Sequence, residues 1–346
     1  MTEVKKIMDT KLFHTDDNEI AEAGEILRNG GLVAFPTETV YGLGASAFDS
    51  DAAKKIYAAK GRPSDNPLIV HICDKGQIKD IAEEIPESAK KVIDNFMPGP
   101  VTIILKKKSV VPNDVTAGLD TVAIRFPLHE TAQKLIKAAG VPIAAPRANL
   151  SGKPSPTKAK HVVKDMTGRI DAIIDGGECN VGVESTIVDF TGEKPVILRP
   201  GGVTYDDLKG IGLDVEIDKN ILHSIAADEV PKCPGMKYKH YAPNAEVTVV
   251  EGEKDAVQSK IKELLEQTEG KVTGVLTMYG AVYDKAVMLS AGSTNKEYAK
   301  NLFAALREFD ELGVEVVFAE FSEKDGYGLA VKNRLYKAAA QRVIHV

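Results

Sequence analysis

The sequence predicts an α/β protein with two domains, the first on a twisted mixed sheet with helices and the second on a smaller, Rossmann-like parallel sheet. The chain has 346 residues, more than one hydrophobic core usually supports. In its first part, strands outnumber helices and follow no strict strand–helix–strand order, which favours a mixed sheet. From Val247 strands and helices alternate regularly, as in parallel sheets. We therefore expect domains at residues 1–205 and 246–346, joined by a linker at 206–245.

Hydrophobic periodicity places the individual elements. In the first domain, apolar runs indicate strands at residues 32–35, 69–72, 101–105, 122–126, 143–145, 173–174, 186–189 and 196–198. Helical periodicity indicates helices at residues 20–28, 52–60, 87–95, 130–139 and 158–166. In the second domain we expect, in order, strand 247–250, helix 255–266, strands 272–277 and 286–289, helix 296–312, strand 314–319 and helix 331–342.

Composition excludes several classes of protein. No apolar run approaches the roughly 20 residues of a membrane span, so no membrane partner is expected. The first 18 residues are polar and carry both charge signs, unlike a signal peptide. Cys73, Cys179 and Cys233 are far apart, which is typical of neither a disulfide framework nor a zinc site. We expect a cytoplasmic protein.

The charge balance argues against binding to a nucleic-acid backbone. The net charge is −6, and residues 1–205 carry 26 Lys and Arg against 27 Asp and Glu. The rest of the chain carries 18 against 23. Proteins that hold RNA or DNA by its phosphates have a basic excess. Direct tRNA binding is therefore not expected, although these charge counts are compatible with a local basic groove.

The most informative segment runs from Lys60 to His71. Its helix stops at Gly61, and two prolines then favour an extended chain. Residues two apart in an extended chain share a face, so Lys60, Arg62 and Ser64 are expected to point the same way. Two cations and a hydroxyl on one strip suit a polyphosphate. The alternative is a helix that merely ends on a cation, which would explain Lys60 but not Arg62.

Other polar residues interrupt apolar strands. The loop 36–39 puts two hydroxyls and a carboxylate at a strand end, where α/β sheets bind ligands, although an ordinary polar turn is equally compatible. His71 lies in an apolar strand, and such a histidine is more often a core residue than a ligand. Arg125 lies in a strand that otherwise looks buried, so it needs an anionic partner from the protein or a substrate. Arg199 raises the same question.

Together these segments resemble the YrdC-type domain. The matching segments are 35–44, 60–63, 66–69, 98–102, 120–125, 145–152, 155–157 and 184–186. The segment 234–243 and the ending 333–339 resemble the long, two-domain form of the same family. The resemblance covers nearly the whole chain and identifies it as similar to the L-threonylcarbamoyladenylate synthases.

The resemblance implies a reaction. In this family threonine, bicarbonate and ATP give threonylcarbamoyl-AMP and pyrophosphate, and a tRNA-modification transferase machinery then uses the product to make threonylcarbamoyladenosine (t6A). A carbamate formed on threonine attacks the α-phosphorus of ATP, so the protein needs no nucleophile of its own. It provides positioning and charge stabilisation. Mg²⁺ is expected to enter with ATP, with no protein side chain as a metal ligand.

The resemblance also assigns residues. Lys60, Arg62 and Asn149 are expected to be catalytic. The expected ATP-binding residues are Lys60, Arg62, Ser64, Thr121, Arg147, Asn149, Ser155, Arg199 and Tyr241. The expected threonine-binding residues are Thr37, His71, Arg125, Ala145 and Ser185. Thr121 could belong to this pocket and not to the ATP site. Arg125 would take the carboxylate of threonine, and Tyr241, on the linker, would cover the site as a lid.

Arg147 departs from the family pattern. The family usually has serine there, in a Pro-Ser-Ala-Asn motif, whereas this chain reads Pro-Arg-Ala-Asn at 146–149. The guanidinium could replace the missing hydroxyl as a stronger phosphate donor. Its bulk could equally crowd the nucleotide, and we expect reduced or altered ATP binding.

Two other functions are compatible with parts of the sequence. An RNA-binding module would grip tRNA directly, which the charge balance disfavours. A carbamoyl-transfer relative is the second, because the YrdC-type domain also occurs in hydrogenase-maturation proteins. The long two-domain layout disfavours it.

Overall fold

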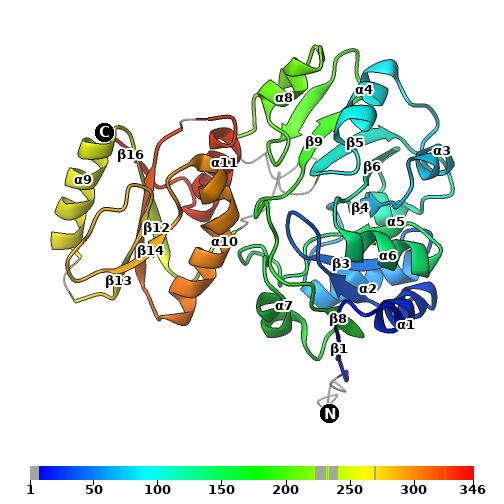
Figure 1. The fold of residues 1–346 in the computed structure, drawn as a ribbon, viewed down its shortest axis with the longest axis horizontal. Coiled ribbons are helices and arrows are strands. Elements are labelled where there is room, and N and C mark those ends of the chain that lie inside the picture. Colours follow the sequence, from blue (N-terminus) through cyan, green and yellow to red (C-terminus); the bar gives the residue numbers. More distant parts are fainter. Residues whose placement is uncertain (1–7, 223–230, 232, 234–240, 269, 324) are drawn as a thin grey trace.

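The computed structural model describes residues 8–222, 231, 233, 241–268, 270–323 and 325–346. Two sheets form two domains that lie side by side, the larger on the right in Figure 1 and the smaller on the left. The predicted combination of a mixed and a parallel sheet is confirmed. Most of the segment 223–240, within the predicted linker, lies outside the described residues.

The first domain has one large sheet with helices packed around it. Its strands are β1 (Lys11–Phe13), β2 (Val33–Phe35), β3 (Gly42–Ser46), β4 (Ile69–His71), β5 (Val101–Lys106), β6 (Thr121–Arg125), β7 (Ile143–Ala145), β8 (Ala172–Ile174), β9 (Thr186–Asp189), β10 (Val196–Arg199) and β11 (Glu216–Ile217). They lie in the order β1-β8-β2-β3-β7-β4-β6-β5-β9-β10-β11. Its helices are α1 (Asp17–Arg28), α2 (Ser50–Lys60), the 3₁₀ turn η1 (Lys75–Gln77), α3 (Ile78–Ile81), α4 (Glu87–Phe96), α5 (Asn113–Thr116), α6 (Glu130–Ala139), α7 (Ala159–Met166) and α8 (Tyr205–Gly210).

Strand register at the centre of this sheet brings distant polar residues together. β4 runs parallel to β6, which places His71 opposite Arg125. β7 runs antiparallel to β4 on its other side, which places Ala145 opposite Ile69. Because side chains of alternate residues share a face, Ile69, His71 and their partners Ala145 and Arg125 lie on one face of the sheet.

The first domain also contains elements that the sequence did not indicate. β3 pairs antiparallel to β2, although its Gly-Leu-Gly-Ala-Ser sequence has no β-branched residue. α8 and β11 follow residue 205, and β11 pairs with β10, so the first sheet continues to Ile217.

The second domain is a five-stranded sheet in the order β14-β13-β15-β12-β16, and all its pairings are parallel. Its elements are β12 (Glu246–Glu251), α9 (Lys254–Glu266), β13 (Thr273–Thr277), β14 (Val287–Ser290), α10 (Asn295–Glu311), β15 (Val316–Phe321), α11 (Gly328–Ala338) and β16 (Val343–His345). The Rossmann-like prediction is confirmed. The expected end of the last helix at residue 342 is wrong, because Ala340 and Gln341 take left-handed backbone angles, φ 49° and 67°, that end the helix before β16.

Helices α10 and α11 of the second domain face the first domain (Figure 1). Arg307, on α10, donates from Nη2 to Oδ2 of Asp165 on α7 over 2.7 Å. Tyr327, before α11, donates its hydroxyl to the carbonyl of Gly202 over 3.1 Å. Gly182 permits the close approach of α10, because a Cβ there would lie 2.3 Å from Cα of Lys300. The domains therefore meet through packed backbone and buried polar contacts.

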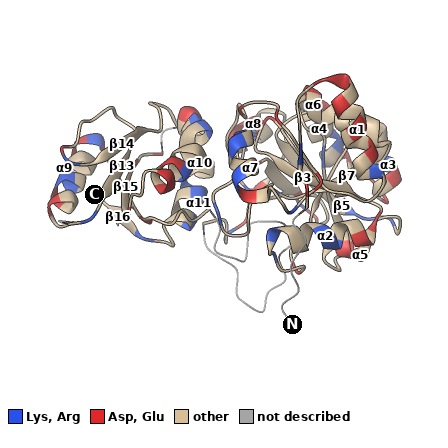
Figure 2. Ribbon diagram, turned by 90° about the horizontal axis from the view of Figure 1, so that it is seen from below, with Lys and Arg blue, Asp and Glu red and all other residues tan. Residues whose placement is uncertain are grey.

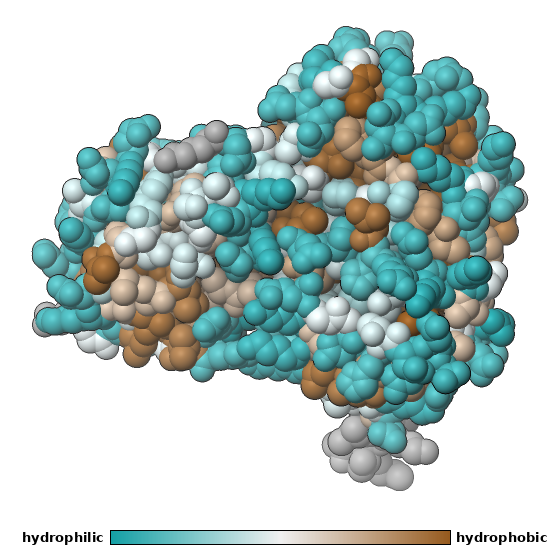
Figure 3. Space-filling view, viewed as in Figure 1, coloured by the Kyte–Doolittle hydropathy of each residue, from teal (hydrophilic) through white to brown (hydrophobic). Residues whose placement is uncertain are grey.

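Hydrophilic residues cover much of the face shown in Figure 3, with smaller hydrophobic areas between them. Within the described part of the chain, no helix is both long enough and apolar enough to cross a bilayer.

Candidate active site

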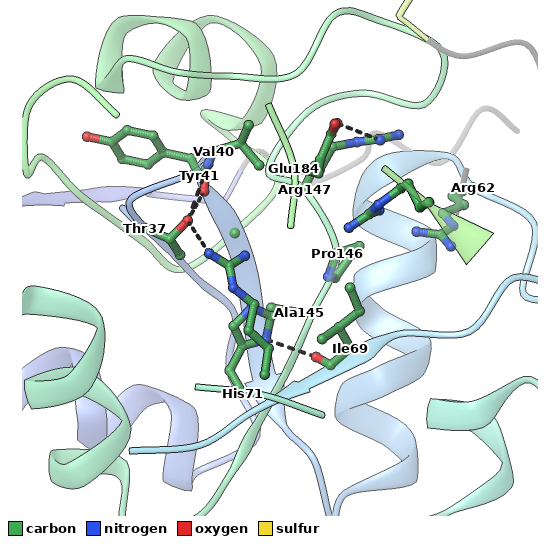
Figure 4. Close-up of a pocket in the computed structure, with 13 residues that line it drawn as sticks. Thr37, Val40, Tyr41, Arg62, Ile69, His71, Ala145, Pro146, Arg147 and Glu184 are labelled. Carbon is green, nitrogen blue, oxygen red and sulfur yellow. Dashed lines mark hydrogen bonds and ion pairs between the residues drawn. The ribbon is translucent and has the colours of Figure 1, made fainter. Parts of the chain in front are cut away.

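A cavity lies over the shared face of β4, β6 and β7, closed at its sides by loops (Figure 4). Its lining residues are Thr37, Val40, Tyr41, Gly42, Arg62, Ile69, His71, Arg125, Ala145, Pro146, Arg147, Glu184 and Arg199. The lining therefore brings together four arginines from four separate segments of the first domain. Such a density of guanidinium groups suits anionic ligands.

Arg125 is the cation nearest to the centre of the sheet. Its Nη2 pairs with Oε1 of Glu38 at 2.9 Å and contacts Oγ1 of Thr37 at 3.4 Å. Both members of the ion pair are buried. Nε of Arg125 has no hydrogen-bond partner among the described residues. The anionic partner that the sequence required is thus a protein carboxylate, and one donor of the guanidinium is left for a second anion.

The loop that carries Glu38 is fixed by its own hydroxyl group. Thr37 donates Oγ1–H to the carbonyl of Val40 over 2.6 Å. The same oxygen accepts the backbone N–H groups of Thr39 and Val40, each at 3.2 Å. This local turn holds Thr37 at the cavity wall, as expected for a ligand-binding loop at a strand end.

His71 lines the same end of the cavity as Arg125. Its Nδ1 lies 3.0 Å from the carbonyl of Ile69, and because a carbonyl only accepts, Nδ1 carries the proton. Burial, and then the charge of Arg125, lowers the pKa of His71 from 6.5 to about 3. The ring is therefore neutral and acts here as a packing and hydrogen-bonding group.

The lowered pKa of His71 predicts acid sensitivity. The unfolded chain binds this proton below its ordinary pKa of 6.5, whereas the folded ring does so only near 3. The free energy of unfolding should thus fall as the pH drops from 6.5 towards 3, by up to about 1.4 kcal/mol per unit. We expect the melting temperature of His71→Asn to fall less than that of the wild type between pH 6.5 and 4.5. An equal fall in melting temperature for the two proteins over this pH range would contradict the prediction.

Lys60 does not point into the cavity. As the last residue of α2 it is buried, and its Nζ donates to the carbonyls of Arg147 and Asn149. Burial, and then the nearby charges of Arg62 and Arg147, holds its pKa well below 10.5. In this structure the ammonium fixes the loop that follows β7, and phosphate contact by Lys60 stays a prediction.

The expectation of one extended strip from Lys60 to Ser64 is wrong. Gly61 takes a left-handed conformation, φ 61°, and residues 64–66 form a turn. Arg62 lines the cavity and donates Nη2 to the carbonyl of Asn66 over 2.9 Å, whereas Ser64 is exposed and does not line the cavity. A proline disfavours the helical conformation only for the residue before it, so Pro63 and Pro67 do not keep Gly61 or Ser64 extended.

Glu184 links several site residues. Its Oε1 accepts Nη1 of Arg147 at 2.9 Å and the hydroxyl of Ser155 at 2.6 Å. Its Oε2 accepts Nε of Arg334, from the second domain, at 2.9 Å. Although burial raises the pKa of Glu184, the charges of Arg334, Arg147 and Arg199 together bring it well below its usual range. The carboxylate is thus ionised, and both of its oxygens accept hydrogen bonds.

Tyr241 contacts the extra arginine directly. Nη1 of Arg147 donates to the Tyr241 hydroxyl over 2.9 Å, and the guanidinium lies 4.7 Å from the centre of its ring. The ring stacks on Phe303 of α10, with centroids 5.1 Å apart. Arg147 thereby ties the end of the predicted linker to the cavity.

The remaining predicted residues lie around the cavity. Arg199 lines it and donates from Nε and Nη2 to the carbonyl of Ser185, while Ser185 itself lies behind the lining. Burial lowers the pKa of Arg199 to about 10, against the opposing charge of Glu184. Asn149 is buried behind the loop, with Oδ1 lacking a hydrogen-bond partner among the described residues. Thr121 begins β6, outside the lining.

Two carboxylates in the site were not assigned from the sequence. Glu38 and Glu184 both stand within the matched segments, each beside a hydroxyl residue. That neighbourhood was the available signal, because a carboxylate in an apolar context needs a cation. In the described part of the chain, no three His, Cys, Asp or Glu side chains gather in a way that could hold a metal ion.

Comparison with known proteins agrees with this architecture. Residues 25–201 match the family of Sua5, YciO and YrdC proteins described as "Telomere recombination". Residues 203–340 match the family described as "Threonylcarbamoyl-AMP synthase, C-terminal domain". The two matches meet between residues 201 and 203.

Individual relatives extend over nearly the whole chain. The threonylcarbamoyl-AMP synthase of Pyrococcus abyssi is 51% identical over 330 residues, covering 95% of this chain and 96% of the relative. That of Bacillus subtilis is 49% identical over 340 residues, covering 97% of each. A crystal structure of P. abyssi Sua5 complexed with L-threonine superposes with a TM-score of 0.94 at 49% identity, covering 97% of this chain and all of that one. The chain therefore belongs to the threonylcarbamoyl-AMP synthase family, in its long form with a YrdC-like first domain and a separate C-terminal domain.

Proposed function

We propose that the protein converts threonine, bicarbonate and ATP into threonylcarbamoyl-AMP and pyrophosphate for t6A synthesis in tRNA. The observation that carries the proposal is that one cavity holds two groups of cations. One is Arg125, whose Nε has no hydrogen-bond partner among the described residues, and the other surrounds Glu184. Membership of the family and the threonine complex of the P. abyssi relative support it.

In this proposal the two ends of the cavity bind different substrates. Arg125 receives the threonine carboxylate, and Thr37, neutral His71 and Ala145 shape the pocket around it. Arg62, Arg147 and Arg199 face the triphosphate. Threonine supplies its own nucleophile after forming a carbamate, so the protein orients the two reactants and stabilises the charge on the phosphates.

Mg²⁺ would enter with the nucleotide in this proposal. The described residues offer no cluster of metal ligands, so phosphate oxygens and water would complete the coordination of the ion. Tyr241, fixed between Arg147 and Phe303, would limit access of water to the hydrolysable product. The product would then pass to a tRNA-modification transferase.

The most direct test measures pyrophosphate release from ATP with threonine and bicarbonate each omitted in turn. We expect release to require both, because the carbamate that attacks ATP contains atoms of each. Release that is unaffected by both omissions would overturn the proposal. Serine and valine in place of threonine serve as matched substrates, because each keeps the carboxylate but loses one group of the side chain.

Arg147→Ser tests the residue that departs from the family pattern. In contrast to the crowding expected from the sequence, we expect the KM for ATP to rise by about tenfold, because the change removes a guanidinium that would face the triphosphate. Hydrogen bonds to Glu184 and Tyr241 hold that guanidinium in place. Tyr241→Phe is the matched control, since it removes only the hydroxyl contact. Higher turnover in Arg147→Ser would instead support crowding of the nucleotide by the long side chain.

Direct RNA binding has less support. In the view of Figure 2, helices of both domains carry Lys or Arg as well as Asp or Glu. The arginines of the cavity are buried or half-buried and already bond to protein groups, so they do not form the exposed surface that a nucleic-acid backbone needs. Salt-sensitive tRNA binding without threonine-dependent ATP turnover would favour this second function.

A further inference from the structure

A buried ion pair joins the two domains inside the candidate site. Arg334, on α11, donates Nε to Oε2 of Glu184 over 2.9 Å. Arg334 has no exposed surface and Glu184 is 3% exposed, so water does not screen the pair. Nη1 of Arg334 also donates to the carbonyl of Pro200, next to Arg199. The guanidinium is therefore anchored at two points of the first domain.

The same carboxylate orients two residues expected to bind ATP. While Oε2 of Glu184 holds Arg334, its Oε1 accepts the Arg147 guanidinium and the Ser155 hydroxyl. Arg199 lies close enough to lower the pKa of the same carboxylate. Three guanidinium groups thus surround one carboxylate, which leaves a net positive charge at the cavity wall, where a triphosphate would bind.

We propose that Arg334 is a positioning residue for the nucleotide. Acting through Glu184, it fixes where the Arg147 guanidinium and the Ser155 hydroxyl lie, and so makes the second domain a working part of the ATP site. The inference deepens the proposed function and rests on it. It also gives the second domain a role in the reaction.

Loss of this anchor has a specific consequence. Without Arg334, Oε2 of Glu184 would have no partner in the described part of the chain, and the carboxylate could turn towards Arg147 with both oxygens. That pairing would draw Arg147 away from the phosphates. Lysine at position 334 would keep the charge, but one ammonium cannot reproduce the two anchored directions of the guanidinium. Loss of the anchor should therefore weaken ATP binding and leave threonine binding at Arg125 nearly unchanged.

The test compares Arg334→Lys with Tyr327→Phe in the full-length protein. Tyr327→Phe is a matched control, because it removes another interdomain hydrogen bond, to the carbonyl of Gly202, without contacting Glu184. Pyrophosphate release gives the KM for each substrate. We expect Arg334→Lys to raise the KM for ATP by about tenfold or more and that for threonine by less than about threefold. Tyr327→Phe should change both by less than about twofold.

Three outcomes would overturn the positioning role. An unchanged KM for ATP in Arg334→Lys would do so, as would an equal rise for both substrates. If Arg334→Lys does not fold, the double change Glu184→Gln and Arg334→Met removes both charges, and a wild-type KM for ATP in that protein would also overturn it. The rise in melting temperature that ATP causes in the wild type and in the variants measures ATP binding at this site independently of turnover. Wild-type protein that ATP stabilises without threonine-dependent turnover would overturn the proposed function alone.

Discussion

Arg125→Lys should raise the KM for threonine by about 100-fold or more, with little change in the KM for ATP. Arg125 holds Glu38 through Nη2 and keeps Nε unpaired among the described residues, so a single side chain can bind a protein and a substrate carboxylate together. A lysine ammonium would remain paired with Glu38, which keeps the buried carboxylate neutralised, but it lacks the second fixed donor. Pyrophosphate release measured against threonine and ATP concentration gives both constants.

Arg28→Lys is the matched control for this change. Arg28 is an arginine too, but it donates to the backbone carbonyls of Ala138 and Ala139 and lies on α1, outside the cavity lining. We expect it to leave both KM values unchanged. A threonine KM in Arg125→Lys equal to that of the wild type would show that the carboxylate binds elsewhere.

Elements with strong periodicity could be predicted closely from the sequence. The long amphipathic helix expected at 296–312 is α10 at Asn295–Glu311, because regular apolar spacing and a capping residue, Thr294, define it locally. β3 could not be predicted in this way. Four of its five residues are glycine, alanine or serine, and they form a strand because β2 and β7 pair with them on either side. That information lies about a hundred residues away, in β7.

The site shows the same division between local and distant information. The sequence required an anion for Arg125, and it offered Thr37 and Glu38 as a polar loop, but only the fold brings them together. Lys60 was assigned to phosphate from its place beside Arg62. Its orientation depends instead on two backbone carbonyls, 87 and 89 residues further along the chain. Such contacts carry no sequence signature, because every residue has a carbonyl.

Glu184→Gln should have the largest effect on stability, lowering the free energy of unfolding by about 3–5 kcal/mol at neutral pH. The change removes the negative charge that offsets the guanidiniums of Arg147, Arg199 and Arg334, of which the last two are buried. It also replaces one accepting oxygen by an N–H₂ group, which cannot accept from an arginine. Because the pKa of Glu184 is lowered on folding, its contribution is present above the ordinary carboxylate pKa of about 4.3 and is lost as the pH falls below it.

Glu251→Gln separates loss of stability from loss of ATP binding. Glu251 is also a shielded, ion-paired carboxylate, 2.7 Å from Nζ of Lys332, but it belongs to the second domain and does not line the cavity. Both variants should melt at lower temperature than the wild type, since each loses a partly or fully buried charge pair. Only Glu184→Gln should also raise the KM for ATP, because only Glu184 orients Arg147 and Ser155. If the two variants had the same KM for ATP, the role of Glu184 would be confined to stability.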